Sequence, residues 1–322
     1  MRILFITSTR IGDAVLSSGL LNHLVQTHPE ARMTVACGPL AAPLFVAVPG
    51  LERILALTKG RYASHWLRLW STCVRQRWDI VVDLRRSLLP WLLVARRRYH
   101  LGNGDTSVHR VRQIADVLAL PEPPAPRLWT LPCHQEAARH LLPPDGPPVL
   151  GIGPTANWRA KVWRADNFVA LIGRLSRMDG ILPGARVAVF GAAAERPLAQ
   201  PVLDALPPAR RIDLVGTGDL LTAYACLQRC AFYIGNDSGV MHLAAAAGIP
   251  TLGLFGPSRE VHYAPWGRNG AVVRTAVPFA AIRPPDFNHR TSGTLMDSLS
   301  VAQTEVAARR LWAETRDGEW RS

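Results

Sequence analysis

Lysine is scarce in this sequence, and that scarcity gives each lysine weight. Lys59 and Lys161 are the only two, although Lys and Arg together number 37. Arginine therefore carries almost all of the positive charge, a bias that genome composition explains. A lysine that falls inside a motif still needs an explanation of its own.

Cysteine is too sparse to form a disulfide framework. The chain has 5 cysteines, Cys37, Cys73, Cys133, Cys226 and Cys230, without regular spacing, which is typical of a reducing compartment. The last pair has i, i+4 spacing, which favours two buried helix positions over a metal site.

Long apolar runs are also missing. No run reaches about 18 apolar residues, so we expect no membrane-spanning helix. The longest candidate, residues 240–255, contains Gly248 and Pro250. Near the start, Arg10 and Asp13 interrupt the apolar run too early for a signal peptide. We therefore expect a cytoplasmic protein.

Two nucleotide-binding motifs are lacking. There is no Asp-x-Asp pair to hold a metal–diphosphate bridge and no GxxxxGK[ST] loop, so we expect no metal. Gly151–Ala156 (GIGPTA) fits G-x-G-x-x-A, but Pro154 follows the second glycine and no helix is expected before about Asp166. This segment is the only support for an NAD-dependent oxidoreductase.

The composition is that of a globular protein with an anionic partner. Hydrophobic residues make up 48% and charged residues 19% of 322 residues, which favours two folded domains. The net charge of +13 favours a nucleotide, a phosphorylated lipid, a membrane surface or a nucleic acid, without choosing among them.

Short apolar runs alternate with helical patterns in both halves of the chain, which predicts α/β domains with parallel sheets. The expected strands are 2–7, 33–37, 54–57, 79–84, 149–152, 186–190, 211–214, 231–234 and 251–255. The expected helices are 13–27, 66–76, 109–120, 135–142, 166–177, 197–206, 220–229, 238–247 and 302–313. A proline-rich segment, 121–148, separates the halves, so we expect domains 1–145 and 146–322.

The most informative motif is Gly235–His242 (GNDSGVMH), between an expected strand and helix. Asp237, Ser238 and Gly239 occupy the turn, where the helix points free N–H groups at an anion. His242 follows Ser238 by four residues and shares its face. Capping of the helix by Asp237 or Ser238 is the alternative, and it leaves His242 unexplained.

A second motif, Gly153–Trp163 (GPTANWRAKVW), is a polar loop that contains Lys161. The lysine suits a diphosphate, whereas a solvated connector with Trp158 and Trp163 packed on the core is the alternative.

A third motif, Gly12–Asp13, follows the first strand. Asp13 is either the helix N-cap or a general base that the helix dipole keeps ionised.

A basic belt forms the fourth feature. Arg85, Arg86 and Arg96–Arg98 bracket the apolar segment 87–95. A solvated flank and a surface attracted to anionic lipid are both open interpretations.

Six segments, in order over nearly the whole chain, resemble the family 9 glycosyltransferases, the bacterial heptosyltransferase type. They are TSTRIGDAVLSSGLLNHL (7–24), DIVVDLRRS (79–87), HRVRQIADVLAL (109–120), NWRAKVWRADNFVAL (157–171), GNDSGVMHLAAAAGIPTLGLFGPS (235–258) and MDSLSVAQTEV (296–306). Several co-linear motifs are far more specific than any one of them.

The resemblance implies a GT-B fold, with two Rossmann-like domains that bind the acceptor mainly on the first and the donor mainly on the second. The family's Gly-Asp matches Gly12–Asp13, so Asp13 is expected to be the catalytic base, with Arg10 and Gly12 on the acceptor side. The residues expected to bind the donor are Asn157, Lys161, Glu195, Gly218, Asp237, Ser238, Gly239 and His242.

Within this set the family assigns different contacts. Asn157 and Lys161 match positions near the diphosphate, Glu195 the ribose, and Gly218 a backbone contact to adenine. Two positions depart from the family: Arg164 stands where Pro is usual, and Asn157 where Ser or Thr is frequent.

The implied reaction is an inverting transfer of a sugar, expected to be heptose from ADP-heptose, to a lipopolysaccharide core or related glycan. Asp13 would take the acceptor proton, and Lys161, the helix N-terminus and His242 would stabilise the leaving diphosphate without a metal or cofactor. We also expect peripheral contact with the anionic inner membrane and no nucleic acid partner. The alternatives are an NAD-dependent oxidoreductase and an inactive sugar-nucleotide binder.

Overall fold

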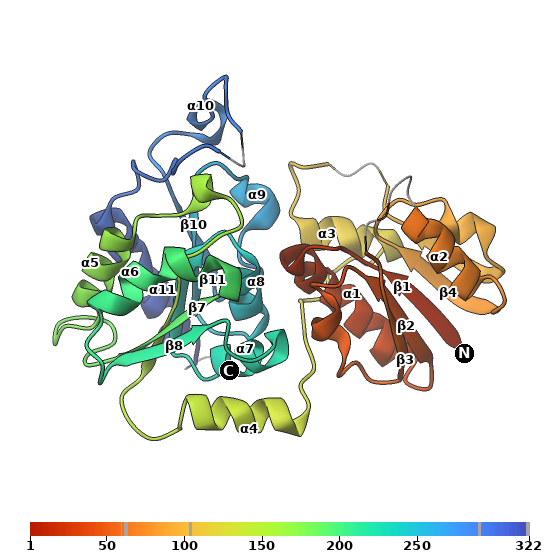
Figure 1. The fold of residues 1–322 in the computed structure, drawn as a ribbon, viewed down its shortest axis with the longest axis horizontal. Coiled ribbons are helices and arrows are strands. Elements are labelled where there is room, and N and C mark those ends of the chain that lie inside the picture. Colours follow the sequence, from red (N-terminus) through yellow and green to blue (C-terminus); the bar gives the residue numbers. More distant parts are fainter. Residues whose placement is uncertain (59, 61–63, 103–104, 289–290, 320–322) are drawn as a thin grey trace. The chain divides into compact units, whose positions relative to one another are not determined.

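The computed structural model describes residues 1–58, 60, 64–102, 105–288 and 291–319. The chain divides into two compact units, Met1–Leu131 and Pro132–Ser322, each built on a parallel sheet (Figure 1). Within the described ranges, no helix combines the length and apolar character needed to cross a membrane.

The first unit contains a five-stranded sheet in the order β3-β2-β1-β4-β5, with every neighbouring pair parallel. Its strands are β1 (Arg2–Ile6), β2 (Arg32–Cys37), β3 (Leu51–Ala56), β4 (Trp78–Asp83) and β5 (Ala95–His100). Its helices are α1 (Ile11–Thr27), α2 (Ser64–Cys73) and α3 (Arg110–Ala115), with short 3₁₀ turns η1 (Ala42–Phe45), η3 (Leu89–Leu92) and η4 (Asp116–Leu118).

The strand order of this sheet reverses between β1 and β4, whose last residues, Ile6 and Asp83, are register partners. The loops that follow these two strands therefore open at one edge, where ligands bind in doubly wound sheets. Strand β5 was not expected, because ARRRYH lacks an apolar run. Its place at the sheet edge explains this, since edge strands tolerate exposed charges such as Arg96 and Arg97.

The second unit contains a six-stranded parallel sheet in the order β11-β10-β9-β6-β7-β8. Its strands are β6 (Val149–Gly153), β7 (Arg186–Gly191), β8 (Arg211–Val215), β9 (Phe232–Asn236), β10 (Thr251–Phe255) and β11 (Gly270–Arg274). Its helices are α4 (Pro132–Leu141), α5 (Ala165–Leu175), α6 (Arg196–Ala205), α7 (Leu220–Leu227), α8 (Gly239–Ala246), α9 (Glu260–Tyr263), α10 (Phe279–Ile282) and α11 (Val301–Glu319), with 3₁₀ turns η5 (Arg159–Lys161) and η6 (Ala193–Glu195).

This order is that of a Rossmann-type sheet, with its reversal between β6 and β9. The predicted α/β class with two doubly wound parallel sheets is therefore confirmed. Helices α5, α6 and α11 bury apolar side chains against the sheet, among them Phe168, Leu203 and Leu311. The predicted helix around Pro201 is α6, which keeps the proline inside it.

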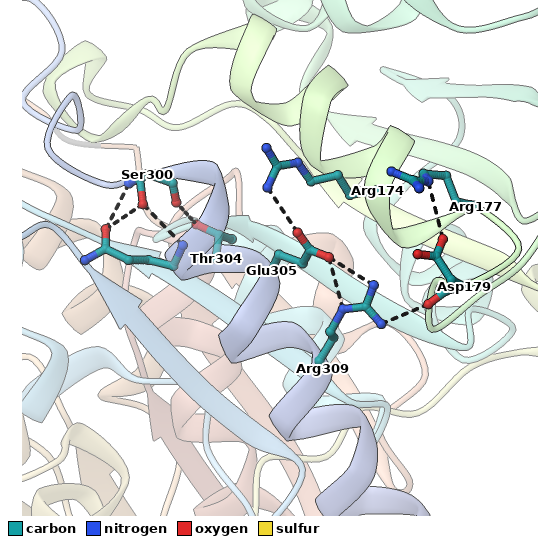
Figure 2. A network of polar contacts seen from close by, with 8 residues as sticks. Arg174, Arg177, Asp179, Ser300, Thr304, Glu305 and Arg309 are labelled. Carbon is teal, nitrogen blue, oxygen red and sulfur yellow. Dashed lines mark hydrogen bonds and ion pairs between the residues drawn. The ribbon is translucent and has the colours of Figure 1, made fainter.

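Polar contacts fasten α11 to the rest of the second unit (Figure 2). Glu305 of α11 accepts hydrogen bonds from Arg174 of α5 at 3.1 Å and from Arg309 at 3.0 Å. Arg309 in turn donates to the backbone oxygen of Asp179 at 3.0 Å. The last helix is thus held to the end of α5 by side chains as well as by its apolar face.

The boundary between the two compact units falls in the chain at Leu131–Pro132, whereas the sequence suggested a boundary near residue 145. The difference comes from α4, which packs on α7 in the second unit. His134 of α4 lies 3.4 Å from the Asp219 carboxylate, and Arg229 Nε donates to the Leu142 oxygen at 2.6 Å. Prolines mark where regular structure stops, but contacts decide to which unit a segment belongs.

Candidate functional site

The carboxyl edge of the second sheet gathers most of the polar residues that the motifs identified. The Lys161 loop follows β6, Glu195 follows β7, Gly218 follows β8, and Asp237–Gly239 follow β9. Because the strands are parallel, these loops all leave the sheet at the same edge. The loops after β6 and β9, the two strands that flank the reversal, form the centre of this edge.

At that centre, a buried carboxylate lies between two basic side chains. Lys161 Nζ donates to Asp237 Oδ2 at 2.5 Å, and His242 Nε2 lies 3.9 Å from Asp237 Oδ1. The Lys161 and Asp237 side chains are 14% and 6% exposed, so their ion pair is largely shielded from water. The ammonium also lies 4.8 Å from the centre of the Trp158 ring, a cation–π contact. The structure therefore brings together Lys161, Asp237 and His242 from two distant motifs.

The start of α8 is not capped by a side chain. Ser238 occupies the N-cap position, but it makes no capping hydrogen bond. Its hydroxyl is buried and lacks a hydrogen-bond partner among the described residues. The Asp237 carboxylate is engaged by Lys161 instead. The capping interpretation of this motif is therefore wrong, and the uncapped N–H groups of the first turn suit an anion.

The loop that carries Lys161 is fixed on both sides. Trp163 donates its backbone N–H to Asn236 Oδ1 at 3.1 Å and its indole N–H to the Leu299 oxygen at 2.9 Å. Leu295 N donates to the Ala160 oxygen at 3.0 Å, and Thr294 Oγ1 to the Val162 oxygen at 2.6 Å. The solvated-connector interpretation is wrong for this loop, although Trp163 is indeed a core residue with no exposed surface.

Arg164, which stands where the resembling family usually has Pro, has a clear structural role. It is the N-cap residue of α5, and its guanidinium forms a bidentate ion pair with Asp297 at 2.6 and 2.8 Å. The pair joins the end of the Lys161 loop to the segment that clamps it. The side-chain hydrogen bond from Arg164 holds the pKa of Asp297 below its usual value.

Tyr233 is a site residue that the sequence did not reveal. A side chain on Gly153 or Gly235 would collide with its hydroxyl, so these glycines leave the space that the tyrosine fills. Complete burial raises the pKa of Tyr233, and the nearby Ser238 hydroxyl opposes that shift. The phenol, which has no partner of normal geometry among the described residues, reaches the loop after β9. The Gly-x-Gly and Tyr-x-Gly patterns are the signal that could have found it.

The same geometry removes the support for a dinucleotide fingerprint in GIGPTA. Gly151 and Gly153 lie inside β6, and the next α-helix, α5, begins only at Ala165. A fingerprint glycine must lie in a tight turn that leads directly into a helix. Here the glycines make room for Tyr233 instead.

Glu195 and Gly218 lie on the side of the site formed by β7 and β8. Glu195 Oε2 accepts the Thr155 hydroxyl at 2.7 Å and the Ala192 N–H at 3.2 Å, which fixes the half-buried carboxylate beside the β6 loop. Gly218 has φ +69, a conformation that favours glycine, and leads into the N-cap residue Asp219. Asn157 is exposed in the Lys161 loop.

An arginine–aromatic cluster next to Trp158 was also missed. The Arg283 guanidinium lies 5.1 Å from the Phe279 ring, 5.0 Å from the Phe287 ring and 5.9 Å from the Trp158 ring. It also donates to the Pro257 oxygen at 2.6 Å. The segment 276–288 lacks a regular hydrophobic pattern, so nothing in its sequence places it near the site.

In the first unit, Asp13 lies in the first turn of α1 and is not its cap. The helix begins at Ile11, and Arg10 is the N-cap residue. The N-cap interpretation of Asp13 is therefore wrong. Its side chain is half-buried, and within the described part of the chain the carboxylate forms no hydrogen bond or ion pair. Gly12 adjoins it in the same turn, and Arg10 is exposed.

The loop after β4 opens at the same edge of this sheet as the loop after β1. Asp83 is completely buried and accepts hydrogen bonds from the backbone of Arg85 and Ser87 at 2.7 Å each, and from the Ser87 hydroxyl at 2.6 Å. The tight turn holds the exposed Arg86 at φ 57, a strained conformation for a side-chain-bearing residue. Such strain is typical of functional loops.

The arginines of the basic belt have two kinds of environment. Arg98 donates to the Pro90 and Leu93 oxygens at 2.8 and 2.9 Å, and Arg85 lies 5.0 Å from the centre of the Trp66 ring. Arg86, Arg96 and Arg97 are exposed. The belt therefore divides into structural arginines and free ones.

The cysteine pair behaves as buried packing. Cys226 and Cys230 are both buried, and burial raises the pKa of Cys226 to about 11. No group of three or more His, Cys, Asp or Glu suited to a metal ion was found among the described residues.

Comparisons with known proteins agree with this arrangement. The family model for glycosyltransferase family 9 (heptosyltransferase) matches residues 71–282. The lipooligosaccharide heptosyltransferase 2 of Haemophilus influenzae is 26% identical over 85% of this chain and 88% of its own. That of Campylobacter jejuni is 30% identical over 84% and 86%. The structure of E. coli ADP-heptose lps heptosyltransferase II has a TM-score of 0.74 at 21% identity, covering 98% of this chain and 100% of its own.

Proposed function

This chain belongs to glycosyltransferase family 9, and from that membership we propose that it transfers heptose from ADP-heptose to a lipopolysaccharide core acceptor, with inversion. The observation that carries the proposal is the convergence of Lys161, His242 and the uncapped start of α8 at the reversal of a Rossmann-type sheet. The names of the relatives supply the sugar and the acceptor class.

The second unit would bind the donor. The β-phosphate would meet the Lys161 ammonium and the first N–H groups of α8, with Ser238, Gly239 and His242 beside it. Asn157 would contact the same phosphates from the Lys161 loop. Glu195 would accept a ribose hydroxyl, and the backbone at Gly218 would contact the adenine.

Asp237 would act on the donor through its partners, because its oxygens face Lys161 and His242. The carboxylate holds the ammonium above Trp158 and lies 3.9 Å from the imidazole. This arrangement fixes positive charge before the donor arrives, which is what electrostatic stabilisation of a leaving group requires.

Asp13 of the first unit would be the general base, with Arg10 and Gly12 beside the acceptor. The acceptor oxygen attacks the anomeric carbon and gives its proton to the Asp13 carboxylate. The bond from that carbon to the β-phosphate oxygen breaks, and ADP leaves with the electron pair. Asp13 lies in the first turn of α1, and within the described residues its carboxylate forms no hydrogen bond or ion pair.

The Lys161 ammonium, the His242 imidazole and the start of α8 would take the part that a divalent metal takes in other glycosyltransferases. We therefore propose turnover without a metal or a cofactor. The acceptor is anionic and lipid-linked, which fits the net charge of +13 and a loose attachment of the protein to the inner membrane.

Calorimetric titration with ADP, UDP and GDP, followed by a transfer assay with the matching heptose donors, tests the proposal. We expect ADP to bind most tightly and ADP-heptose to be consumed only when a core acceptor is present. Equal affinity for the three nucleotides, or transfer from a UDP- or GDP-linked sugar alone, would refute the assignment of the donor.

A further inference from the structure

The first unit exposes a group of large apolar side chains that its own core does not use. They come from α2 and from the segment after β4, and we call them the apolar platform: Leu67, Trp70, Leu88, Trp91, Leu92 and Val94. Leu88, Trp91, Leu92 and Val94 are 77%, 63%, 60% and 60% exposed. Single exposed apolar residues are ordinary, whereas a contiguous group marks an interaction surface.

The two parts of the platform touch. Trp70 Nε1 of α2 donates a hydrogen bond to the Leu92 oxygen of η3 at 3.2 Å. Trp91 packs against His100 of β5, with ring centres 5.8 Å apart. The exposed side chains of helix and turn therefore form one surface.

The platform stands on a rigid base. Between its exposed residues, Leu89 and Leu93 point inward and join the core with Leu69 and Trp78. The Arg98 guanidinium fixes the backbone oxygens of Pro90 and Leu93. The outward direction of the platform is thus built into the fold.

Exposed arginines flank the platform residues along the chain. Arg68 belongs to α2, Arg86 precedes Leu88 by two residues, and Arg96 and Arg97 of β5 follow Val94 by two and three residues. Residues 53–104 contain 11 Lys and Arg but only two acidic residues, Asp79 and Asp83.

These two carboxylates are too few to balance the positive charge of this segment. Asp79 accepts the Arg2 N–H, and Asp83 is completely buried in its own loop. The surface therefore combines protruding Trp and Leu side chains with exposed arginines in a segment that has an excess of positive charge.

We propose that the apolar platform inserts into the interface of an anionic lipid bilayer, with the flanking arginines on the lipid phosphates. Trp and Leu next to Arg is the composition of interfacial anchors, and the charge matches an anionic leaflet. The proposal rests on the proposed function, in which the acceptor is lipid-linked, and it names the surface that brings the enzyme to that acceptor.

Flotation with acceptor-free vesicles tests this surface separately from catalysis. The vesicles are phosphatidylcholine alone, or phosphatidylcholine with an equal amount of phosphatidylglycerol. We expect binding to the anionic vesicles that weakens with salt. Trp91→Ser/Leu92→Ser should reduce the partition coefficient at least about tenfold. Arg96→Gln/Arg97→Gln should reduce it about fivefold per arginine at low salt.

Met178→Ser/Val306→Ser is the matched control, because these side chains are 90% and 67% exposed in the second unit. It should bind vesicles like the parent. Heptosyl transfer to a deacylated, water-soluble acceptor should be the same in every variant as in the parent. If the parent itself transfers no heptose to this acceptor, the proposed function is refuted instead. Melting curves identify any variant that fails to fold, and the arginine pair lies outside the core.

Two results would overturn the proposal. One is equal binding of the parent and Trp91→Ser/Leu92→Ser to anionic vesicles. The other is a parent that is dimeric in sedimentation, with the same variant monomeric and vesicle binding unaffected, which would make the platform an interface between copies of the chain.

Discussion

Removing the charge of Lys161 should separate its role in binding from its role in the fold. In Lys161→Met, the donor diphosphate loses a hydrogen bond from a charged group, worth about 1.5–3 kcal/mol. That loss corresponds to ADP binding about 10- to 150-fold more weakly. We expect the upper part of this range, because Asp237, only 6% exposed, would then face the diphosphate without its neutralising partner.

The same substitution should lower stability, since it leaves a buried carboxylate whose remaining basic neighbour, His242, is 3.9 Å away. Breaking a buried ion pair costs up to about 3–5 kcal/mol. Calorimetry must therefore be carried out well below the melting temperature of the variant. The double variant Lys161→Met/Asp237→Asn removes the unpaired charge and should regain most of the stability.

Two comparisons decide what Lys161 does. Arg159→Met is the matched control, because Arg159 is an exposed cation in the same 3₁₀ turn, and we expect its ADP affinity to stay within about threefold of the parent. Parent-like ADP affinity in folded Lys161→Met would refute the phosphate contact. Parent-like affinity in the double variant but not in the single one would mean that the lysine only neutralises Asp237.

Four further outcomes follow from the structure. Asp13→Asn should lower turnover by about 10²–10⁴-fold with little change in ADP affinity, and near-normal turnover of the folded variant would remove Asp13 as the base. Tyr233→Phe should keep its melting temperature but bind ADP more weakly, because its hydroxyl lies beside Ser238; unchanged affinity would leave the phenol without a part in donor binding. Burial raises the pKa of Glu305, but hydrogen bonds from Arg309 and Arg174 outweigh burial and lower the pKa. The ionised Glu305 therefore stabilises the fold above the usual glutamate pKa of about 4.3, and this stabilisation is lost as the pH falls through the lower pKa of the folded state. Glu305→Gln should thus melt about 2–4 °C lower at pH 7, a gap that closes in acid, and a gap independent of pH would contradict the linkage. EDTA should leave turnover unchanged, and loss that Mg²⁺ or Mn²⁺ restores would show that the positive groups of the site need a metal.

The sequence predicted the site best where the sheet topology alone determines the position of a residue. Lys161 and Asp237 are separated by 76 residues, yet each follows a buried strand at the reversal of the sheet. The rule that ligands bind beyond the carboxyl ends of parallel strands was enough to expect them at one edge. The contact between their side chains, and the use of Asp237 as a partner instead of a cap, required coordinates.

Edge elements escaped prediction because they lack the signal on which prediction depends. Strand β5 carries Arg96–Arg98, and β11 is half-buried along its length, so neither reads as an apolar run. Helix α1 begins at Ile11, and its N-cap residue, Arg10, makes no capping hydrogen bond. No sequence rule predicts a helix start at such a residue. Tyr233 looks like an ordinary core residue until the space left by Gly153 and Gly235 is seen.

Heptosyl transfer by this protein can be measured by incubating it with ADP-heptose and a heptose-acceptor lipopolysaccharide core, and following the acceptor by mass spectrometry and NMR. We predict that the acceptor gains one heptosyl group, with the anomeric configuration inverted relative to the donor, in step with the release of ADP. Release of ADP without a heavier acceptor, or a product that retains the donor configuration, would contradict it.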